Sequence, residues 1–262
     1  NFLVDIDSRK IRKGSVFFAI KGDNFNGNEF IGDALKNGSR LAISDEENPN
    51  LNHNHNVIKV SNSLSTLQEL SKFHRKKCNA KVIAITGSNG KTTTKELIYS
   101  VLSSNFKTIC TTGNFNNHIG LPLSLFEIRH DTEFAVIEMG ANNFGEIAFL
   151  TSLCEPDYGY ITNFGKAHLE GFINIDGVIK AKTELYQWII KNDKTLLING
   201  EDKNQKKFDN HKHIMFGCGK NFQLNFREKN NDFVNVLHDD YLFETKLYGT
   251  YNYSNVCAAI AL

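Results

Sequence analysis

The hydrophobic positions of this chain follow two patterns that change near residue 79. Before residue 79, apolar runs are short and are separated by turn residues, which is typical of a small α/β unit. The pattern predicts strands at 15–20, 41–43 and 57–60 and helices at 28–37 and 63–77. In the second helix, four apolar side chains recur at helical spacing, and we expect them to face the core: Leu64, Leu67, Leu70 and Phe73.

From Asn79 onward, longer strands alternate with helices, which predicts a parallel sheet with crossover helices. The expected strands are 81–86, 107–110, 133–139, 157–162 and 194–198, with a further short one near Ile214. The expected helices are 91–104, 120–127, 145–152 and 176–191. Beyond Asp202, the segments 223–226 and 233–236 alternate like the antiparallel strands of a small ribbon.

The junction of the strand 81–86 with the next helix carries the clearest chemical signal. A β-branched run leads into Thr86-Gly87-Ser88-Asn89-Gly90-Lys91-Thr92, and a helical pattern follows. This strand–loop–helix order is that of a phosphate-binding loop, in which glycines let backbone N–H groups turn toward an anion. We expect Lys91 to lie along the β- and γ-phosphates and the Thr92 hydroxyl to ligate Mg²⁺.

Three further polar clusters follow expected strands of the same sheet. Glu138 ends one strand, His168 follows the next, and the polar loop 111–120 connects a strand to a helix. Taken alone, a carboxylate such as Glu138 is more often a helix cap or an ion-pair partner than a metal ligand. Functional residues of parallel sheets gather at the carboxyl ends of the strands, so the convergence favours a site beside the phosphate loop.

The composition narrows the functional classes. The 262 residues are 40% hydrophobic, enough for one large core or two smaller ones. The net charge of +1 provides no field that attracts nucleic acid or an anionic membrane. Five scattered cysteines without a C-x-x-C pair indicate a reducing compartment such as the cytoplasm, and argue against a disulfide framework or a zinc site. No apolar run approaches the roughly 20 residues of a membrane span, so we expect no stable membrane insertion.

Two polar stretches of the first 78 residues have an open interpretation. Asp7-Ser8-Arg9 and the loop from Gly22 to Gly27 contain groups that can bind an anion. From the residues alone, a solvated loop is the better interpretation of both.

These motifs together resemble the Mur ligases. The matching stretches occur in the order of that family: Asp7-Ser8-Arg9, the Gly22–Gly27 loop, the phosphate loop, Gly113 to Pro122, Glu138 to Asn142, Asn163 to Gly171, Ala181 to Tyr186, and Asn252 to Asn255. The Asn114-Phe115-Asn116-Asn117 loop and Glu138-Met139-Gly140-Ala141-Asn142 resemble the branch that adds D-alanyl-D-alanine to UDP-N-acetylmuramoyl-tripeptide. One departure is Tyr251, which stands where the family usually has histidine.

The resemblance implies an α/β enzyme with a small α/β UDP-binding domain at 1–78, followed by a P-loop parallel-sheet ATPase domain with a small antiparallel ribbon at 79–262. A third, carboxyl-terminal domain that holds the dipeptide is absent from this sequence, and both ends of the chain are expected to be truncated. The implied reaction is ATP- and Mg²⁺-dependent amide ligation through an acyl phosphate. The chain alone is expected to be inactive, and the protein to be a monomer.

The resemblance also implies roles for individual residues. The implied catalytic residues are Lys91, Glu138, His168 and Lys182. Those implied to bind the nucleotide are Gly87, Ser88, Asn89, Gly90, Lys91, Thr92, Thr93, Asn114 and Asn255. Those implied to bind the UDP-peptide are Ser8, Arg9, Gly22, Gly27, Asn116 and Asn117. The implied metal ligands are Thr92, Glu138, His168 and Lys182, the last as a carbamate formed with CO₂.

Two alternatives stay open at this point. The same ligase chemistry can use a free amino acid, as in the diaminopimelate- or lysine-adding relative or in folylpolyglutamate synthase. A phosphate loop can also belong to a regulatory module that binds nucleotide and catalyses nothing. The set of Glu138, His168 and Lys182 argues against the regulatory module.

Overall fold

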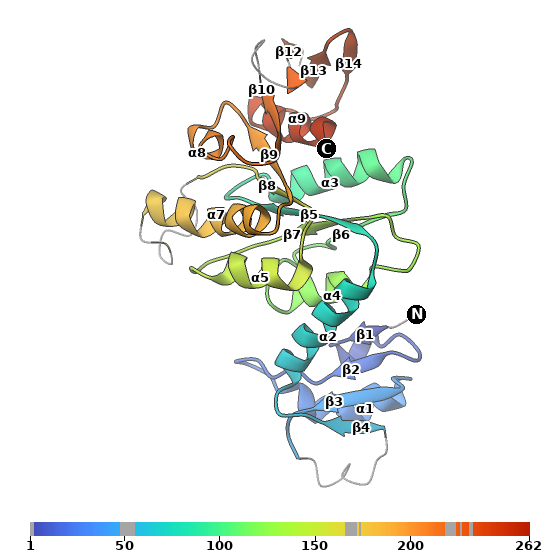
Figure 1. The fold of residues 1–262 in the computed structure, drawn as a ribbon. Helices are drawn as coiled ribbons and strands as arrows, with labels where there is room; N and C mark the ends of the chain where they lie inside the picture. Colours follow the sequence, from blue (N-terminus) through green and yellow to red (C-terminus); the bar gives the residue numbers. More distant parts are fainter. Residues whose placement is uncertain are drawn as a thin grey trace.

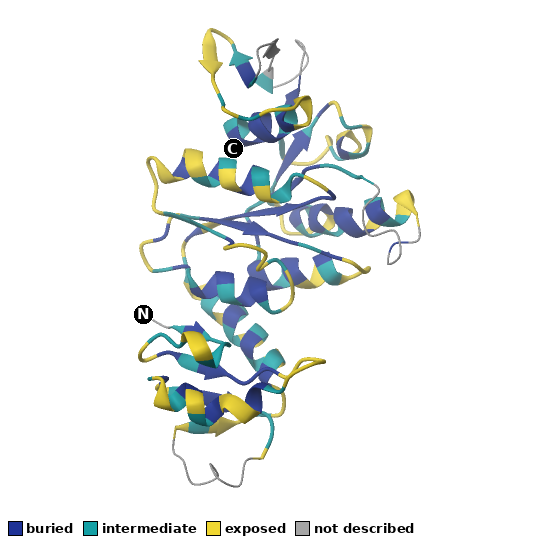
Figure 2. Ribbon diagram, turned by 180° about the vertical axis from the view of Figure 1, so that it is seen from behind, coloured by how far each residue is buried: buried dark blue, intermediate teal, exposed yellow. Residues whose placement is uncertain are grey.

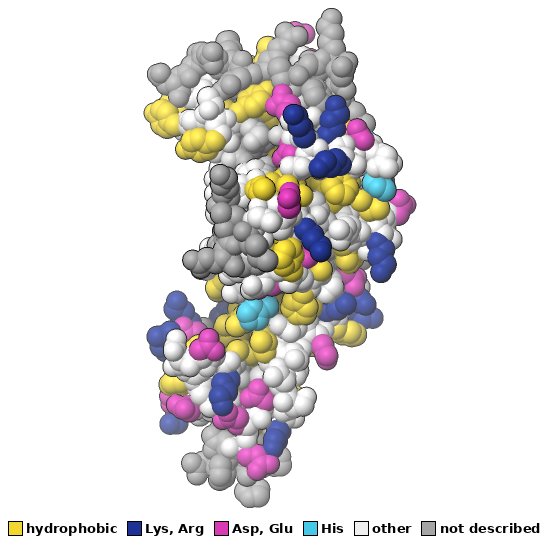
Figure 3. All heavy atoms as spheres, turned by 90° about the vertical axis from the view of Figure 1, so that its left-hand side faces the viewer, with side chains coloured by type: hydrophobic (Ala, Val, Ile, Leu, Met, Phe, Trp, Pro, Cys, Tyr) yellow, Lys and Arg dark blue, Asp and Glu magenta, His cyan; other side chains and the backbone are white. Residues whose placement is uncertain are grey.

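The computed structural model describes residues 3–47, 56–165, 172, 174–217, 224–225, 227–230 and 233–262. It contains a four-stranded, a seven-stranded and a three-stranded sheet, arranged along the molecule in that order (Figure 1). In the described part of the chain, no helix is both long and apolar enough to cross a membrane. On the face shown in Figure 3, basic and acidic side chains are interspersed, in keeping with the net charge near zero.

The first sheet is parallel throughout, in the order β1 (Val4–Asp5), β2 (Val16–Phe18), β3 (Leu41–Ser44) and β4 (Val57–Lys59). The three expected strands are confirmed, whereas β1 was not expected because two residues are too short to show an alternating pattern. The segment expected as one helix from 28 to 37 begins as the 3₁₀ helix η2 (Gly27–Phe30) and continues as α1 (Ile31–Lys36). A second 3₁₀ turn, η1 (Ser8–Lys10), follows β1.

Helix α2 (Ser63–Lys77) joins the first sheet to the rest of the molecule, packing against α4 (Gly120–Phe126) and α5 (Glu146–Cys154). The expected core stripe is wrong at Phe73, which is 60% exposed. The buried residues of the helix follow each other at four-residue spacing instead: Ser63, Leu67, Ser71 and Arg75. Small serines allow close helix contact, and the Arg75 guanidinium is buried because its Nε donates to the carbonyl oxygen of Cys154 at 2.8 Å.

The seven-stranded sheet has the order β11-β10-β9-β8-β5-β7-β6, and all its neighbouring pairs are parallel. Its strands are β5 (Lys81–Thr86), β6 (Thr108–Cys110), β7 (Phe134–Glu138), β8 (Tyr158–Ile161), β9 (Thr195–Asn199), β10 (His213–Gly217) and β11 (Leu224–Asn225). The expected parallel sheet is therefore confirmed. Between β5 and β8 the strand order reverses, which is where open α/β sheets bind their ligands.

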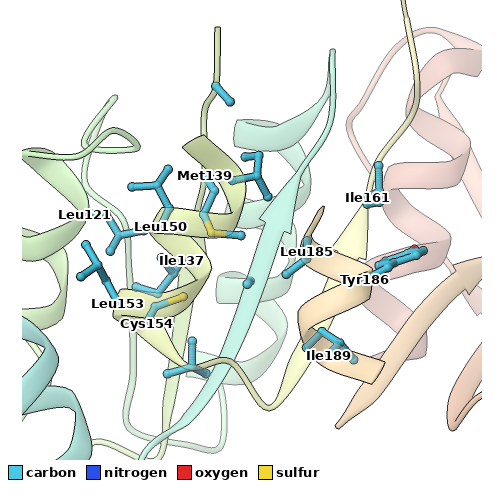
Figure 4. Packing of buried hydrophobic residues seen from close by; sticks show 14 of the residues in the cluster. Leu121, Ile137, Met139, Leu150, Leu153, Cys154, Ile161, Leu185, Tyr186 and Ile189 are labelled. Carbon is cyan, nitrogen blue, oxygen red and sulfur yellow. The ribbon is translucent and has the colours of Figure 1, made fainter. Parts of the chain in front are cut away.

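Helices cover both faces of this sheet. Val82 and Ala84 of β5 face α4, α5 and α7 (Ile175–Lys191), whereas Ile83 and Ile85 face α3 (Lys91–Ser103) and α9 (Tyr253–Ala261). Figure 2 shows the buried strands between helices whose outer surfaces are exposed. Figure 4 shows the core below the sheet, where Leu150 of α5 and Leu185 of α7 belong to one apolar cluster.

The third sheet is an antiparallel ribbon of β12 (Arg227–Asn230), β13 (Val234–His238) and β14 (Tyr241–Phe243). The expected ribbon strand at 233–236 is confirmed, but its expected partner at 223–226 is wrong. Leu224 and Asn225 instead extend the parallel sheet, pairing with Phe216 and Gly217. A short polar-apolar alternation does not distinguish an added edge strand from a ribbon strand, because both have one exposed face. The remaining short helices are α8 (Lys203–Lys206) and η3 (Thr250–Asn252).

Candidate active site at the phosphate loop

The phosphate loop lies between β5 and α3, and its two glycines are required by geometry. Gly90 ends the loop with φ of +77°, a left-handed conformation that side chains disfavour, and a Cβ there would lie 2.8 Å from Asn255 Oδ1. Gly87 has φ of +144°, and a Cβ there would collide with the Thr162 hydroxyl. The predicted loop and the helix that follows it are confirmed as elements.

Residues after β8 fix the loop from the neighbouring strand. Thr162 Oγ1 donates to the carbonyl oxygen of Asn89 at 2.6 Å, and Asn163 Oδ1 accepts from the Asn89 N–H at 3.1 Å. The Ser88 hydroxyl donates to the carbonyl oxygen of Gly165 at 3.0 Å. Thr162 and Asn163 were not predicted as site residues. The signal for them was the polar pair Thr162-Asn163 at the carboxyl end of the expected strand 157–162.

Lys91 begins α3 and folds back over the loop. Its Nζ donates to the carbonyl oxygens of Gly87 at 2.8 Å and Ser88 at 3.2 Å. Burial lowers the pKa of Lys91, because a charged ammonium loses hydration there, and the nearby Glu138 carboxylate opposes this effect. A positive charge is thus fixed beside the backbone N–H groups of the loop.

Glu138 ends β7 and is only 2% exposed. Thr92 Oγ1 donates to its Oε2 at 2.9 Å, and Asn116 Nδ2 donates to its Oε1 at 2.7 Å. The backbone N–H of Glu138 donates to Thr111 Oγ1 at 3.0 Å, a contact that the sequence did not indicate. The structure therefore brings Thr92, Asn116 and Glu138 together, as predicted.

Hydroxyl and carboxylate oxygens are the ligands that Mg²⁺ prefers, so Thr92 and Glu138 fit this ion. Within the ranges that the structure describes, no group of three or more His, Cys, Asp or Glu side chains converges on one point. A magnesium ion at Thr92 and Glu138 would take its other ligands from phosphate and water, which is the usual pattern for this ion. His168, the predicted imidazole ligand, lies outside the described residues.

Lys182 lies in the middle of α7 and is 1% exposed. Burial and the nearby Lys91 ammonium lower its pKa to about 8, whereas Glu146 and Glu184 oppose this shift. Its Nζ lies 5.6 Å from the centre of the Phe172 ring. An ammonium does not fit as a ligand of a cation, but the carbamate of a neutral lysine supplies an anionic oxygen.

The other predicted nucleotide and peptide residues of this region have mixed contacts. Asn117 Oδ1 accepts from the N–H groups of Ile119 and Gly120, and so caps α4. Asn114 is exposed in the same loop. Thr93 is half-buried in the first turn of α3. Asn255 is buried against Gly90, and its Oδ1 accepts from Thr94 Oγ1 at 3.0 Å, so it stabilises the loop from the α9 side.

The predicted residues of the first sheet lie at the carboxyl ends of their strands. Arg9 is 84% exposed, and its Nε donates to Asp7 at 2.8 Å. The Arg9 hydrogen bond lowers the pKa of Asp7 to about 2. The Ser8 carbonyl oxygen accepts from Asn37. Gly22 and Gly27 enclose a compact turn, in which the Gly22 N–H donates to Phe25 and the Gly27 N–H donates to Ile20.

A cavity of about 560 Å³ lies between the first sheet and the β6 edge of the seven-stranded sheet. Asp7, Lys10 and Arg12 line one side, and Thr112 and Phe115 of the polar loop 111–120 line the other. The cavity therefore runs from the Asp7-Ser8-Arg9 motif toward the loop that carries Asn116. Arg12 also links the two sides, since it donates to both Asp5 and Glu127 at 2.8 Å.

Comparisons with known families match almost the whole chain. Residues 85–262 match the family description "Mur ligase middle domain", and residues 3–75 match "Mur ligase family, catalytic domain". The UDP-N-acetylmuramoyl-tripeptide–D-alanyl-D-alanine ligase of Bacillus subtilis (strain 168) is 35% identical over 262 residues, which are 98% of this chain and 57% of that protein. The chain thus spans a little over half the length of this curated relative.

Solved structures show the same likeness. A crystal structure of MurF from Acinetobacter baumannii superposes with a TM-score of 0.86 at 31% identity, covering 98% of this chain and 58% of that chain. The MurF ligase of Thermotoga maritima, in complex with ADP, gives a TM-score of 0.83 at 29% identity, covering 99% of this chain and 62% of that chain.

Proposed function

Because this chain belongs to the Mur ligase family, we propose that it is part of an ATP-dependent ligase that joins D-alanyl-D-alanine to UDP-N-acetylmuramoyl-tripeptide. The observation that carries the proposal is the Glu138 carboxylate, held by Thr92 and Asn116 beside the phosphate loop. The name of the Bacillus subtilis relative, matched over 98% of this chain, supports this choice of substrates.

The residues suit transfer of a phosphoryl group to a carboxylate. A peptide carboxylate oxygen attacks the γ-phosphorus of ATP, ADP leaves, and an acyl phosphate results. The amine of D-alanyl-D-alanine then attacks the acyl carbon, phosphate leaves, and the nitrogen loses its proton. Lys91 and the loop N–H groups stabilise the anionic oxygens of the first step. Thr92 and Glu138 would hold Mg²⁺, which would supply further neutralising charge.

Lys182 contributes to this site as a carbamate. Its neutral amine attacks CO₂, a nitrogen–carbon bond forms, and one proton is released. The lowered pKa supports this step, since it raises the fraction of neutral amine near neutral pH.

We assign residues 1–78 to a domain that holds the UDP end of the substrate and residues 79–262 to the ATP-binding domain. Ser8, Arg9 and the Gly22–Gly27 turn bind the UDP part, and the 560 Å³ cavity accepts the sugar-peptide between the two. The scattered cysteines, of which the four that the structure describes are free, support a cytoplasmic location.

Product analysis with the complete natural protein tests the proposal. With ATP, Mg²⁺, the UDP-tripeptide and D-alanyl-D-alanine, we expect a UDP-pentapeptide, ADP and phosphate in equal amounts. Lys182→Arg is expected to abolish the product. Addition of a single amino acid to a UDP-dipeptide, with no product from D-alanyl-D-alanine, would instead identify an amino-acid-adding ligase. No ligation with either acceptor would leave a nucleotide-binding module.

A further inference from the structure

Glu184 connects α7 to α5, and this contact has no role in the reaction proposed for the site. It follows Lys182 by two residues on α7, and its carboxylate extends to the start of α5. Its Oε1 accepts from the N–H of Gly145 at 2.8 Å, and its Oε2 accepts from the N–H of Ala148 at 2.9 Å. Gly145 precedes α5 and has no side chain to cap it, so Glu184 provides the negative charge that a helix N-terminus favours.

The loop between β7 and α5 connects this contact to Glu138. At one end of the loop, Glu146 Oε2 accepts from the N–H of Asn142 at 2.8 Å. At the other end, the N–H of Gly140 donates to the carbonyl oxygen of Asn116 at 2.8 Å, and the Asn116 side chain donates to Glu138. Hydrogen bonds and the short backbone segments between them thus connect the helix that carries Lys182 to the carboxylate at the phosphate loop.

Apolar side chains also pack between α5 and α7. Leu150 and Leu153 of α5 belong to the same buried cluster as Leu185 and Ile189 of α7 (Figure 4). Apolar burial is not directional, so it holds the two helices together without fixing how far one slides along the other. The two hydrogen bonds of Glu184 are directional and fix that position.

We propose that Glu184 is a positioning residue that sets the place of Lys182 relative to Glu138. The inference rests on the proposed ligase function. The phosphate loop itself is fixed by Thr162, Asn163 and Asn255, none of which lies on α5. Loss of the Glu184 contact is therefore expected to affect the chemical step and not the binding of ATP.

Glu184→Gln tests the proposal in the complete natural protein, because the amide has the same shape but only one acceptor oxygen. We expect kcat to fall at least tenfold and the KM for ATP to change less than threefold. Hydrogen–deuterium exchange of residues 139–148 is expected to become faster. The matched control is Asp202→Asn, since Asp202 also accepts from two backbone N–H groups at a helix start, those of Asn204 and Gln205. The control is expected to keep kcat within twofold of the wild type.

Glu184→Asp provides a second variant that keeps the charge, and we expect it to retain more activity than Glu184→Gln. Unchanged kcat in Glu184→Gln would overturn the proposal while the ligase function stands. A loss of kcat with unchanged exchange at 139–148, or with equal loss in the Asp202 control, would overturn it as well. A wild-type protein without ligation would overturn the ligase function, and the positioning role with it.

Discussion

At the scale of single residues, the site holds two lysine side chains that are partly or fully buried, although a charged ammonium is more stable in water. The Lys91 and Lys182 ammonium groups are both removed from solvent near one another, and burial lowers the pKa of each. Such perturbed groups collect at active sites because the chemistry needs them, although they cost stability.

Replacing Lys91 with alanine tests its contact with phosphate. One charge-assisted hydrogen bond is lost, and each contributes roughly 1.5–3 kcal/mol to binding. We expect the affinity for ATP, measured by isothermal titration, to fall at least tenfold while the melting temperature stays close to that of the wild type. Lys107→Ala is a matched control, since Lys107 is exposed and pairs with Asp131 away from the loop. Equal affinity of Lys91→Ala and the wild type would remove Lys91 from the site.

Lys182 gives a prediction for stability. Its pKa in the folded protein, about 8, lies below its ordinary value of 10.5, so the unfolded chain binds more protons between these two pH values. The free energy of unfolding therefore rises with pH across this window, and burial of the charge costs stability below it. Lys182→Met is expected to be more stable at pH 7 by up to about 3 kcal/mol. The stability difference should shrink toward pH 10 in urea denaturation, and a constant difference would contradict the assignment.

The phosphate-loop motif located Thr92, and the meeting of parallel strand ends at one edge located Glu138 and the loop that carries Asn116. Sequence reasoning did not locate Thr162 or Glu184. These two side chains act through backbone groups of another element, and the spacing of residue types carries no information about such contacts.

At the scale of elements, strands of three or more residues in both parallel sheets were predicted, and the two-residue strands were not. The buried run of β5 and the amphipathic pattern of α7 each exceed the length at which periodicity becomes clear. β1 and β11 have two residues each, and their positions depend on the strand beside them. Phe73 was misplaced because α2 packs through its small and polar residues against other helices.

Arg75 tests how α2 is held. Its guanidinium donates to the carbonyl oxygens of Cys154 and Glu155 and contacts Asp157, all near the end of α5. Arg75→Ala removes the side-chain donor from the buried carbonyl oxygen of Cys154, although Asp157 keeps its bonds from the Val82 N–H and Lys194. We expect a loss of about 2–4 kcal/mol in the free energy of unfolding. Lys77→Ala, an exposed change on the same helix, is expected to stay within about 0.5 kcal/mol of the wild type. Similar urea midpoints for both variants would show that Arg75 is not a structural link.

At the scale of the whole molecule, the predicted division into two α/β parts corresponds to the two parallel sheets. The cavity between them was beyond prediction, because its walls come from residues more than a hundred positions apart, such as Asp7 and Glu127. The packing of α2 against α4 and the contacts of Arg12 help to bring these walls together.

The two-part arrangement predicts separable ligands. Arg9 lies in η1, directly after β1 of the first sheet, so Arg9→Ala is expected to weaken binding of the UDP-tripeptide at least fivefold and to leave the affinity for ATP unchanged. Lys13→Ala, an exposed change nearby on the same part, is the control. Isothermal titration of each variant with the UDP-tripeptide and, separately, with ATP measures the two affinities. Equal loss for both ligands, or for neither, would contradict the assignment of the UDP site to the first part.

Helix α2 limits where the chain can be divided to make a truncated protein or a chimera. Leu67 is buried in one cluster with Phe18 and Ile20 of the first part and with Phe126 of α4. Apolar surface is therefore exposed whichever side of α2 is cut. A chimera that exchanges the first part between relatives therefore needs matched residues on α2 and α4 as well. The unit that can be exchanged is thus larger than the first sheet. It includes α2 and the residues of α4 against which α2 packs.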